Sequence, residues 1–245
     1  MIISLTLQPD LVNTSVGKLE PRHSLLGVFF CGPMHKGGNM KDFSLTKNLE
    51  TIFASKTAIF ALIALVVFVF VFIRIKKIKF TPKLITMVGL AVALSIVLGM
   101  LKIYKMPQGG SITLGSMVPV ILMAIFYGPE VGFLTGFLVG LLNLFIDPYI
   151  LHPIQVLFDY PLPYMALGLA GYFKNNKYVG TVVGILGRYV FHILSGVIFF
   201  SSYAGGQNPV IYSMIYNISY LGPDALVCFI IMSLLPIKEL AKRAA

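Results

Sequence analysis

The sequence predicts an all-α, polytopic membrane protein, because the chain is too apolar to form a soluble domain of its length. Of its 245 residues, 57% belong to the hydrophobic set AVILMFWYC and 11% are charged. Soluble domains have about 25% charged residues, and the mean hydropathy of this chain is +0.88. The apolar residues form continuous runs, which favours helices over a transmembrane β-barrel with its short alternating segments. Two cysteines exclude a disulfide scaffold, and the composition excludes disorder.

Seven apolar segments are predicted to cross the bilayer, since a helix of about 20 residues spans its hydrocarbon core of about 30 Å. The first has the purest apolar run in its second half, and the third is short. In the fifth, Pro161 disfavours helical geometry at Tyr160, so a break is expected there. The predicted spans are 51–73, 84–104, 115–127, 130–146, 154–173, 179–200 and 210–236.

The distribution of Lys and Arg predicts the orientation of these spans. The basic run at 74–83 should be cytoplasmic, and alternation then places the basic segments 174–178 and 237–245 inside as well. Much of the net charge of +10 is thereby explained by topology, and no nucleic-acid partner is expected. The bilayer is the expected surroundings, and the run at 74–83 can also attract anionic lipid. Four lysines do not fit this orientation, because they fall in segments that are expected to lie outside: Lys41, Lys47, Lys102 and Lys105.

The chain divides into four predicted parts. Residues 1–50 form a polar segment, 51–83 an additional N-terminal span with its basic linker, 84–236 the main membrane domain and 237–245 a cytoplasmic tail. The stretch Lys36–Met40 can be encoded by a purine-rich sequence typical of a bacterial ribosome-binding site. Met40 is therefore the expected native start, with residues 1–39 as translated leader.

Ionisable side chains within spans are costly, about 2.5–3.5 kcal/mol or more each, so each needs a reason. Asp159 lies one helical turn after Gln155, directly before the expected break at Tyr160, and suits an organic cation near the outer mouth. The alternative is a structural ion pair with Arg188.

A second polar face is expected on the sixth span. Arg188, His192, Ser195 and Phe199/Phe200 follow each other at spacings of three and four residues, which places them on one side of a helix. Arg188 can instead compensate the charge of Asp159 or Asp224, and His192 can be a satisfied core histidine. A single histidine without further ligands at suitable spacing is poor support for a metal site, and none is expected.

The seventh span and one outer loop complete the predicted site. The last span contains Tyr212, Tyr216, Asn217 and Tyr220, and the amide of Asn217 can pair with the edge of a heterocyclic base. Its alternative role is to join helices by hydrogen bonds. The loop 106–111 contains Gly110 and Ser111 and can close over a site, although its composition is also that of a plain turn.

Sequence patterns of several enzyme classes are missing. The chain has no G-x-x-x-x-G-K-[ST], H-E-x-x-H or G-x-S-x-G pattern. One carboxylate, several aromatic rings, one Asn and one His are typical of a binding site. The sequence therefore predicts a binding protein that is not an enzyme and has no cofactor.

Four ordered motifs resemble one known family. They are MPQGGS at 106–111, HPIQVLFDY at 152–160, RYVFHILSGVIFFSSY at 188–203 and NPVIYSMIYNISYLGP at 208–223. Together they resemble the thiamine permease family, the thiamine-specific S component of energy-coupling factor transporters. The resemblance covers about 84–236 and leaves 51–73 as an additional N-terminal transmembrane helix. It implies a six-helix S-component bundle whose thiamine pocket opens outward under a loop between the first two family helices.

The resemblance also implies site residues and partners. Asp159 stands where the family has an acidic residue, Tyr160 follows it, and Arg188 stands at a basic position. Phe200 stands where some members have a stacking Trp, and this chain has no Trp. The implied partners are thiamine, a shared energy-coupling transmembrane subunit and two ATPase subunits in a bacterial, Gram-positive cell membrane. The implied substrate-binding residues are Asp159, Tyr160, Arg188, His192, Phe200, Tyr212, Asn217, Gly110 and Ser111.

Two other classes remain open at this point. A stand-alone, proton-coupled transporter of thiamine or a thiamine precursor would favour internal repeats, and none is evident. A membrane enzyme or sensor is the other. The recurring small residues of the second span, Gly89, Ala91, Ala93, Ser95 and Gly99, resemble the stripe by which the family docks its shared membrane subunit, and can equally pack inside the bundle.

Overall fold

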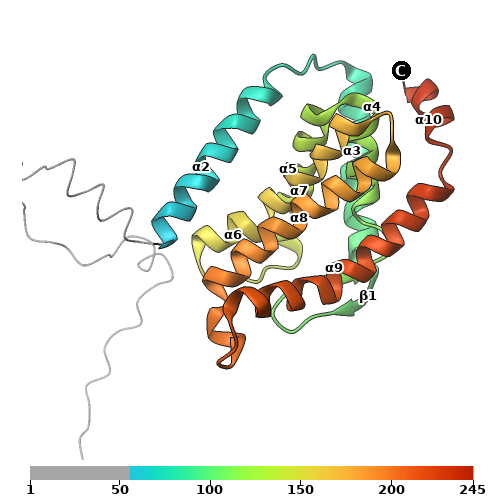
Figure 1. Cartoon of the computed structure of the whole chain (residues 1–245). Coiled ribbons are helices and arrows are strands. Elements are labelled where there is room, and N and C mark those ends of the chain that lie inside the picture. The colour runs from blue at the N-terminus through green and yellow to red at the C-terminus, as the bar shows by residue number, and fades with distance from the viewer. Residues whose placement is uncertain (1–55, 245) are drawn as a thin grey trace, which may run out of the picture. The chain divides into compact units, whose positions relative to one another are not determined.

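A computed structural model describes residues 56–244. The predictions for residues 1–55, including the start at Met40 and the first residues of the first span, lie outside that range. The elements in chain order are α2 (Lys56–Ile75), α3 (Pro82–Met100), β1 (Lys102–Lys105), β2 (Ser111–Thr113), α4 (Val118–Tyr127), α5 (Pro129–Ile146), α6 (Pro153–Asp159), α7 (Pro161–Ala166), the 3-10 helix η2 (Leu167–Phe173), α8 (Lys177–Phe199), the 3-10 helix η3 (Ser201–Ala204), α9 (Pro209–Leu234) and α10 (Ile237–Ala244) (Figure 1).

Several helices begin where the sequence supplies a capping side chain. Thr81 accepts a hydrogen bond from the Leu84 backbone N–H at the start of α3. The Asn176 and Asn208 side chains accept in the same way at the starts of α8 and α9. An N-cap oxygen satisfies one of the backbone donors that a helix start leaves free, which fixes these helix starts.

Four of the described helices are long and apolar enough to cross a membrane, namely α3, α5, α8 and α9. The apolar part of α2 described here, Ala61–Ile75, and the helix α4 are shorter. Figure 1 shows the α2–α3 connection and α10 at one end of the bundle, and the β1 strand and the α8–α9 turn at the other. The basic run at 74–83 therefore lies at the end opposite the β-hairpin, as the predicted orientation requires.

The second predicted span is shorter than expected. Its helix α3 ends at Met100 rather than 104, and Lys102–Lys105 instead forms the strand β1, which pairs antiparallel with β2. The turn is made by Gly109 and Gly110, both with φ of +87°, a conformation that suits glycine, and the Met106 N–H bonds to the Gly110 carbonyl at 2.9 Å. The outer loop singled out in the sequence, 106–111, is therefore the tip of a hairpin.

The fifth predicted span is broken, as Pro161 predicts. Tyr160 has φ −113° and ψ −81°, and it separates α6 from α7, which continues as η2. This segment lies against glycines of α5. A Cβ atom at Gly136 would lie 2.1 Å from the Tyr164 carbonyl oxygen, and one at Gly140 would lie 2.4 Å from that of Tyr160. Only glycine permits this approach of two backbones.

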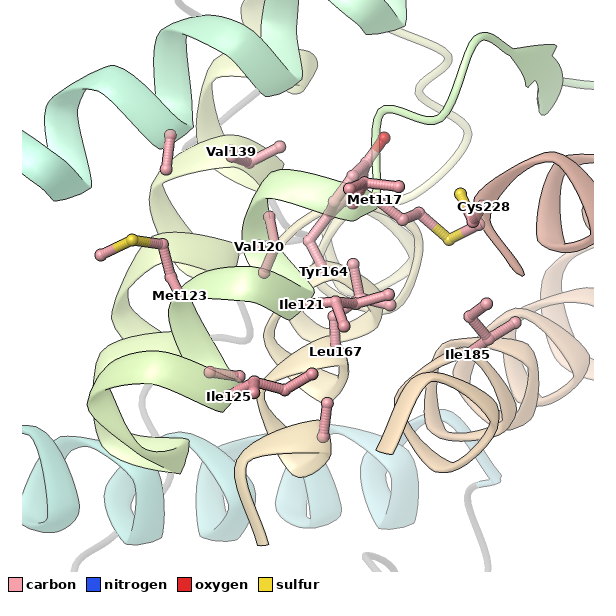
Figure 2. Packing of buried hydrophobic residues seen from close by; sticks show 14 of the residues in the cluster. Met117, Val120, Ile121, Met123, Ile125, Val139, Tyr164, Leu167, Ile185 and Cys228 are labelled. Atoms are coloured by element: carbon pink, nitrogen blue, oxygen red, sulfur yellow. The ribbon is translucent and has the colours of Figure 1, made fainter. Parts of the chain in front are cut away.

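The main core lies around α4. Val120, Ile121 and Ala124 are fully buried there, and they pack in one cluster with Leu167 of η2 and Cys228 of α9 (Figure 2). A shell of side chains on every side explains why α4 is buried although it is too short to span the bilayer alone.

A second apolar cluster joins α2 to the rest of the bundle. Ala64 and Val71 of α2 are buried against Phe133 of α5 and against Phe158 and Leu162 of the broken segment. Most other large side chains of α2 are exposed, as expected for a helix that faces lipid on its remaining sides.

The small residues of α3 divide between two faces. Ala91 and Ser95 are buried inside the bundle, whereas Gly89 and Ala93 are exposed. A Cβ atom at Gly89 would meet nothing within 4 Å. The predicted stripe is thus an inner row that packs within this chain and an outer row that does not.

Candidate functional site

One cavity of about 260 Å³ lies at the hairpin end of the bundle. Its walls come from the hairpin, the α5–α6 connection, the α6–α7 break, α8 and α9. Its volume is close to the lower end of the range for small-molecule sites, about 300 Å³. All the residues predicted for the site line it: Gly110, Ser111, Asp159, Tyr160, Arg188, His192, Phe200, Tyr212 and Asn217.

The carboxylate of Asp159 is held at the wall of this cavity by Gln155. The fully buried amide of Gln155 donates to Asp159 Oδ2 and to the Tyr149 carbonyl at 3.0 Å, and it accepts from the Leu151 N–H at 3.0 Å. One oxygen of Asp159 is thus fixed by the protein, while its side chain stays 19% exposed. The arrangement presents a half-buried negative charge to a ligand.

His192 lies between the carboxylate of Asp159 and the guanidinium of Arg188. Its Nδ1 lies 3.7 Å from Asp159 Oδ1, and its Nε2 accepts from Arg188 Nε at 3.4 Å. These contacts fit a neutral imidazole with its proton on Nδ1, because a protonated ring has no acceptor for the guanidinium. A neutral imidazole suits a cationic ligand better than a protonated imidazole, which would repel it.

Arg188 is buried, yet no carboxylate in the described part of the chain lies within 4.0 Å of its guanidinium. Its guanidinium lies over the ring of Tyr164, 4.2 Å from the centroid. Among the ion pairs within 4.0 Å in residues 56–244, none joins Arg188 to Asp159 or Asp224. Its Nη1 has no hydrogen-bond partner there. A buried donor without a partner is costly, so this atom is available to an acceptor on a ligand.

The amide of Asn217 is largely occupied by the protein. Its Nδ2 donates to Ser213 O at 2.8 Å and to His192 O at 3.3 Å, which joins α9 to α8. Its Oδ1 accepts from the Tyr220 hydroxyl at 2.9 Å. An amide oxygen accepts two hydrogen bonds, so Oδ1 keeps one lone pair for a ligand N–H. The predicted helix-joining role and the predicted ligand role therefore coexist.

Aromatic rings form the outer part of the cavity. Phe200 stacks on Tyr149, with ring centroids 5.9 Å apart and planes 22° apart. Tyr212 and Tyr216 lie beside each other on α9, with centroids 6.0 Å apart. Flat faces of this kind suit a planar or cationic ring.

The hairpin tip is bonded to α9 across the cavity. The Tyr216 hydroxyl accepts from the Gln108 N–H at 3.0 Å and donates to the Gly109 carbonyl at 3.0 Å. The Tyr212 hydroxyl donates to Gln108 Oε1 at 2.9 Å. These bonds hold residues 108–110 at the wall of the site.

Sequence reasoning missed several residues that line the cavity. Gln108 lies in the loop that was singled out, but its side chain was not assigned. Tyr149 lies in an outer loop that has no Lys or Arg and carries no periodic signal, and Tyr164 looks like an ordinary core residue in an apolar run. Only the folded arrangement brings these three side chains to one cavity.

The family comparison matches most of the membrane part of the chain. Residues 85–244 match the model of the family described as thiamine transporter protein (Thia_YuaJ). The chain belongs to this family. Its members are transport proteins, so the prediction that the chain is not an enzyme is confirmed. The match begins within α3 and leaves α2 outside.

Named relatives agree with this assignment. The thiamine transporter ThiT of Bacillus subtilis (strain 168) is 37% identical over 167 residues, covering 61% of this chain and 85% of the relative. ThiT of Lacticaseibacillus paracasei is 25% identical over 122 residues, covering 41% and 61%. A solved structure of ThiT from Listeria monocytogenes superposes with a TM-score of 0.59 at 25% identity, over 66% of this chain and 96% of the other. The predicted multi-pass fold with one additional N-terminal helix is confirmed.

Proposed function

We propose that this protein binds thiamine with high affinity in the cavity at the hairpin end and mediates its uptake. The observation that carries the proposal is the content of that cavity: one half-buried carboxylate, Asp159, among aromatic faces and a neutral His192. Thiamine has a permanent thiazolium cation and a flat aminopyrimidine. The named ThiT relatives and the family support the same ligand.

Each part of thiamine has a chemical counterpart in the cavity. Asp159 supplies the charge opposite the thiazolium, and Phe200 and Tyr212 supply ring faces. The remaining lone pair of Asn217 Oδ1 can accept from the pyrimidine amino group, and the free Nη1 of Arg188 can donate to a pyrimidine nitrogen. The ligand would thus satisfy the buried donor that the protein leaves without a partner.

Calorimetry of the purified full chain with thiamine tests the ligand. We expect saturable binding at micromolar thiamine, without ATP and unchanged by EDTA. Titration with thiamine monophosphate and with the isolated aminopyrimidine shows which part of the ligand is recognised. Absence of heat with thiamine from a folded sample would overturn the proposal, and binding that requires a metal would contradict the proposed chemistry.

We further propose that the chain is the substrate-specific subunit of an ATP-driven energy-coupling factor transporter in a Gram-positive cell membrane. The chain has no phosphate-binding G-x-x-x-x-G-K-[ST] motif of its own. The outer row of small residues on α3, Gly89 and Ala93, is exposed and leaves room for a second helix to approach closely. Both observations support partners that supply ATP hydrolysis and a docking helix.

Uptake into cells that lack endogenous thiamine transport tests this partnership. We expect accumulation of labelled thiamine only when the energy-coupling membrane subunit and both ATPase subunits are co-expressed. Accumulation by the chain alone that collapses with the proton gradient would overturn the proposal in favour of a stand-alone, proton-coupled transporter.

A further inference from the structure

Two of the four lysines that oppose the predicted orientation have a defined place in the structure. Lys102 and Lys105 lie at the two ends of strand β1 and reach the same side chain, Asp147, which follows α5. Lys102 Nζ donates to Asp147 Oδ2, and Lys105 Nζ donates to Asp147 Oδ1 at 2.7 Å. Each oxygen of one carboxylate thus binds one lysine of the hairpin.

Asp147 is itself fixed to the helical bundle. Its backbone N–H donates to the Asn143 carbonyl of α5 at 3.0 Å. Its carbonyl accepts from the Tyr160 hydroxyl at 3.0 Å, and that hydroxyl also accepts from the Tyr149 N–H at 2.6 Å. The carboxylate is therefore presented from a rigid position beside the break between α6 and α7.

The ionisation of Asp147 agrees with this geometry. Burial raises the pKa of the Asp147 carboxyl, but the hydrogen bonds and positive charges of Lys102 and Lys105 outweigh burial and hold that pKa below its ordinary value. The Asp147 carboxyl is therefore ionised at neutral pH. The side chain of Asp147 is 36% exposed, that of Lys102 28% and that of Lys105 56%, so both ion pairs are in partial contact with water.

Within the described residues, the hairpin is also attached to α9 at its base and at its tip. At its base, Thr113 N–H and Oγ1 donate to Asp224 Oδ1 at 2.9 and 2.8 Å. At its tip, Gln108 bonds to Tyr212 and Tyr216. Among the hydrogen bonds and ion pairs of residues 56–244, those of Asp147 alone join the hairpin to the α5–α6 side of the cavity. The cavity lies between these two sides, and Lys102, Lys105 and Asp147 are among the residues that line it.

We propose that Asp147 is a positioning residue that fastens the hairpin across the cavity and so sets the rates at which thiamine enters and leaves. Movement of the hairpin away from the α5–α6 side must break both ion pairs. This inference rests on the proposed function, because thiamine is the ligand whose exchange is measured.

The proposal has a specific kinetic consequence. Both partners of each ion pair belong to the protein, so the pairs stabilise the closed hairpin by the same amount with and without ligand. Where the closed hairpin predominates both with and without ligand, removing the pairs raises the small open fraction by the same factor in both forms, and ligand association and dissociation then accelerate by that factor. The dissociation constant does not change. A residue that contacts the ligand would instead change the dissociation constant.

The experiment compares Asp147→Asn with the wild-type full chain. The dissociation rate constant is measured by chasing bound labelled thiamine with unlabelled thiamine, the association rate constant by mixing, and Kd by calorimetry. We expect both rate constants to rise by roughly twofold to thirtyfold, the range for two partly exposed ion pairs, with Kd within about twofold of wild type. Glu130→Gln is the matched control, because it removes an ion pair of similar exposure at the opposite end, where Glu130 lies 3.8 Å from Arg74.

A charge exchange excludes simple structural damage. Asp147→Lys should accelerate exchange further, and adding Lys102→Asp and Lys105→Asp to it should return both rate constants toward wild type. A changed Kd with an unchanged association rate constant would overturn the proposal, because Asp147 would then act on the bound ligand. Unchanged rate constants in Asp147→Asn would overturn it as well.

A measurement without ligand separates this proposal from the proposed function. Asp147→Asn should accelerate amide hydrogen exchange in the hairpin, residues 102–113, and leave that of α4 unchanged. If the wild-type chain binds no thiamine, the proposed function fails, and hydrogen exchange alone then decides whether Asp147 fastens the hairpin. Equal exchange in both proteins would overturn the fastening role.

Discussion

Asp159 and Asp224 are both carboxylates within the predicted spans, but their surroundings differ. Asp159 lines the cavity, whereas Asp224 is 1% exposed and accepts both hydrogen bonds of Thr113. We expect Asp159→Asn to weaken thiamine binding by roughly tenfold to a hundredfold, the range for losing a charged partner. Asp224→Asn keeps an acceptor for Thr113 and should change Kd far less. Calorimetry measures Kd for both variants, and thermal melting shows whether they are folded. A loss of thiamine binding in Asp224→Asn alone would show that Asp224, not Asp159, is the carboxylate of the site.

Phe200 offers a second test at the level of one side chain. Its ring lines the cavity, but Phe attracts a cation less strongly than Trp does. Phe200→Trp should therefore tighten thiamine binding by roughly twofold to fivefold. The matched control is Phe199→Trp, because Phe199 stacks on His152 instead, with centroids 5.3 Å apart. Equal effects of the two substitutions on Kd would contradict a cation-binding role for Phe200.

At the scale of elements, the hairpin tip depends on two neighbouring glycines in different ways. Gly109 and Gly110 share a φ of +87°, so alanine strains the backbone at either position. A Cβ atom at Gly110 would also lie 2.7 Å from the Tyr220 ring, whereas one at Gly109 would lie 3.8 Å from Tyr149. Gly110→Ala should therefore weaken thiamine binding clearly more than Gly109→Ala, as measured by Kd. Equal losses would mean that backbone strain, not contact with Tyr220, governs the tip.

Helix α2 contributes to packing but not to the cavity. Its residues Ala64 and Val71 contact α5 and the broken segment, and none of the α2 side chains that the structure describes lines the site. Lipid tails are as apolar as the side chains that α2 covers, so its removal costs little in a membrane. A chain that begins at Lys76, and so keeps the lysines that set topology, should bind thiamine with Kd within about twofold of the full chain. A loss of binding in correctly inserted protein would show that α2 shapes the site.

At the scale of the whole molecule, the two rows of small residues on α3 separate folding from docking. Ala93 is exposed, so Ala93→Trp should abolish co-purification with the energy-coupling subunits and thiamine uptake, while Kd stays unchanged. Ala91 is buried, so Ala91→Trp should overpack the bundle and lower the melting temperature. Val182→Trp, on an exposed part of α8, is the control for bulk alone. Normal uptake by Ala93→Trp would place the docking face elsewhere.

The sequence allowed the helices to be predicted, because long apolar runs are local signals. The break at Tyr160 followed from Pro161 in the same way. The hairpin was missed because the strands of four and three residues carry no hydropathy signal, and Lys102–Tyr104 seemed to continue the apolar run. The inner and outer rows of α3 were not distinguished, because spacing shows which residues share a face but not which face is covered.

The site was predictable where a polar residue interrupts an apolar run, as at Asp159, Arg188 and Asn217. It was not predictable where a residue gains its role from a distant neighbour. Gln108 meets α9 more than a hundred positions later in the chain. Lys102 and Lys105 looked like exceptions to a charge rule until the structure brought Asp147 to them.

The glycines of α5 have a consequence for redesign of the pocket. Gly136 and Gly140 set where the segment around Tyr160 lies, through backbone contact alone, and neither glycine lines the cavity. Recognition chemistry and placement therefore depend on different residues. To obtain a receptor for another flat cation, Asp159, Asn217 or Phe200 can be exchanged. The backbone around Tyr160 should keep its position as long as Gly136 and Gly140 are retained.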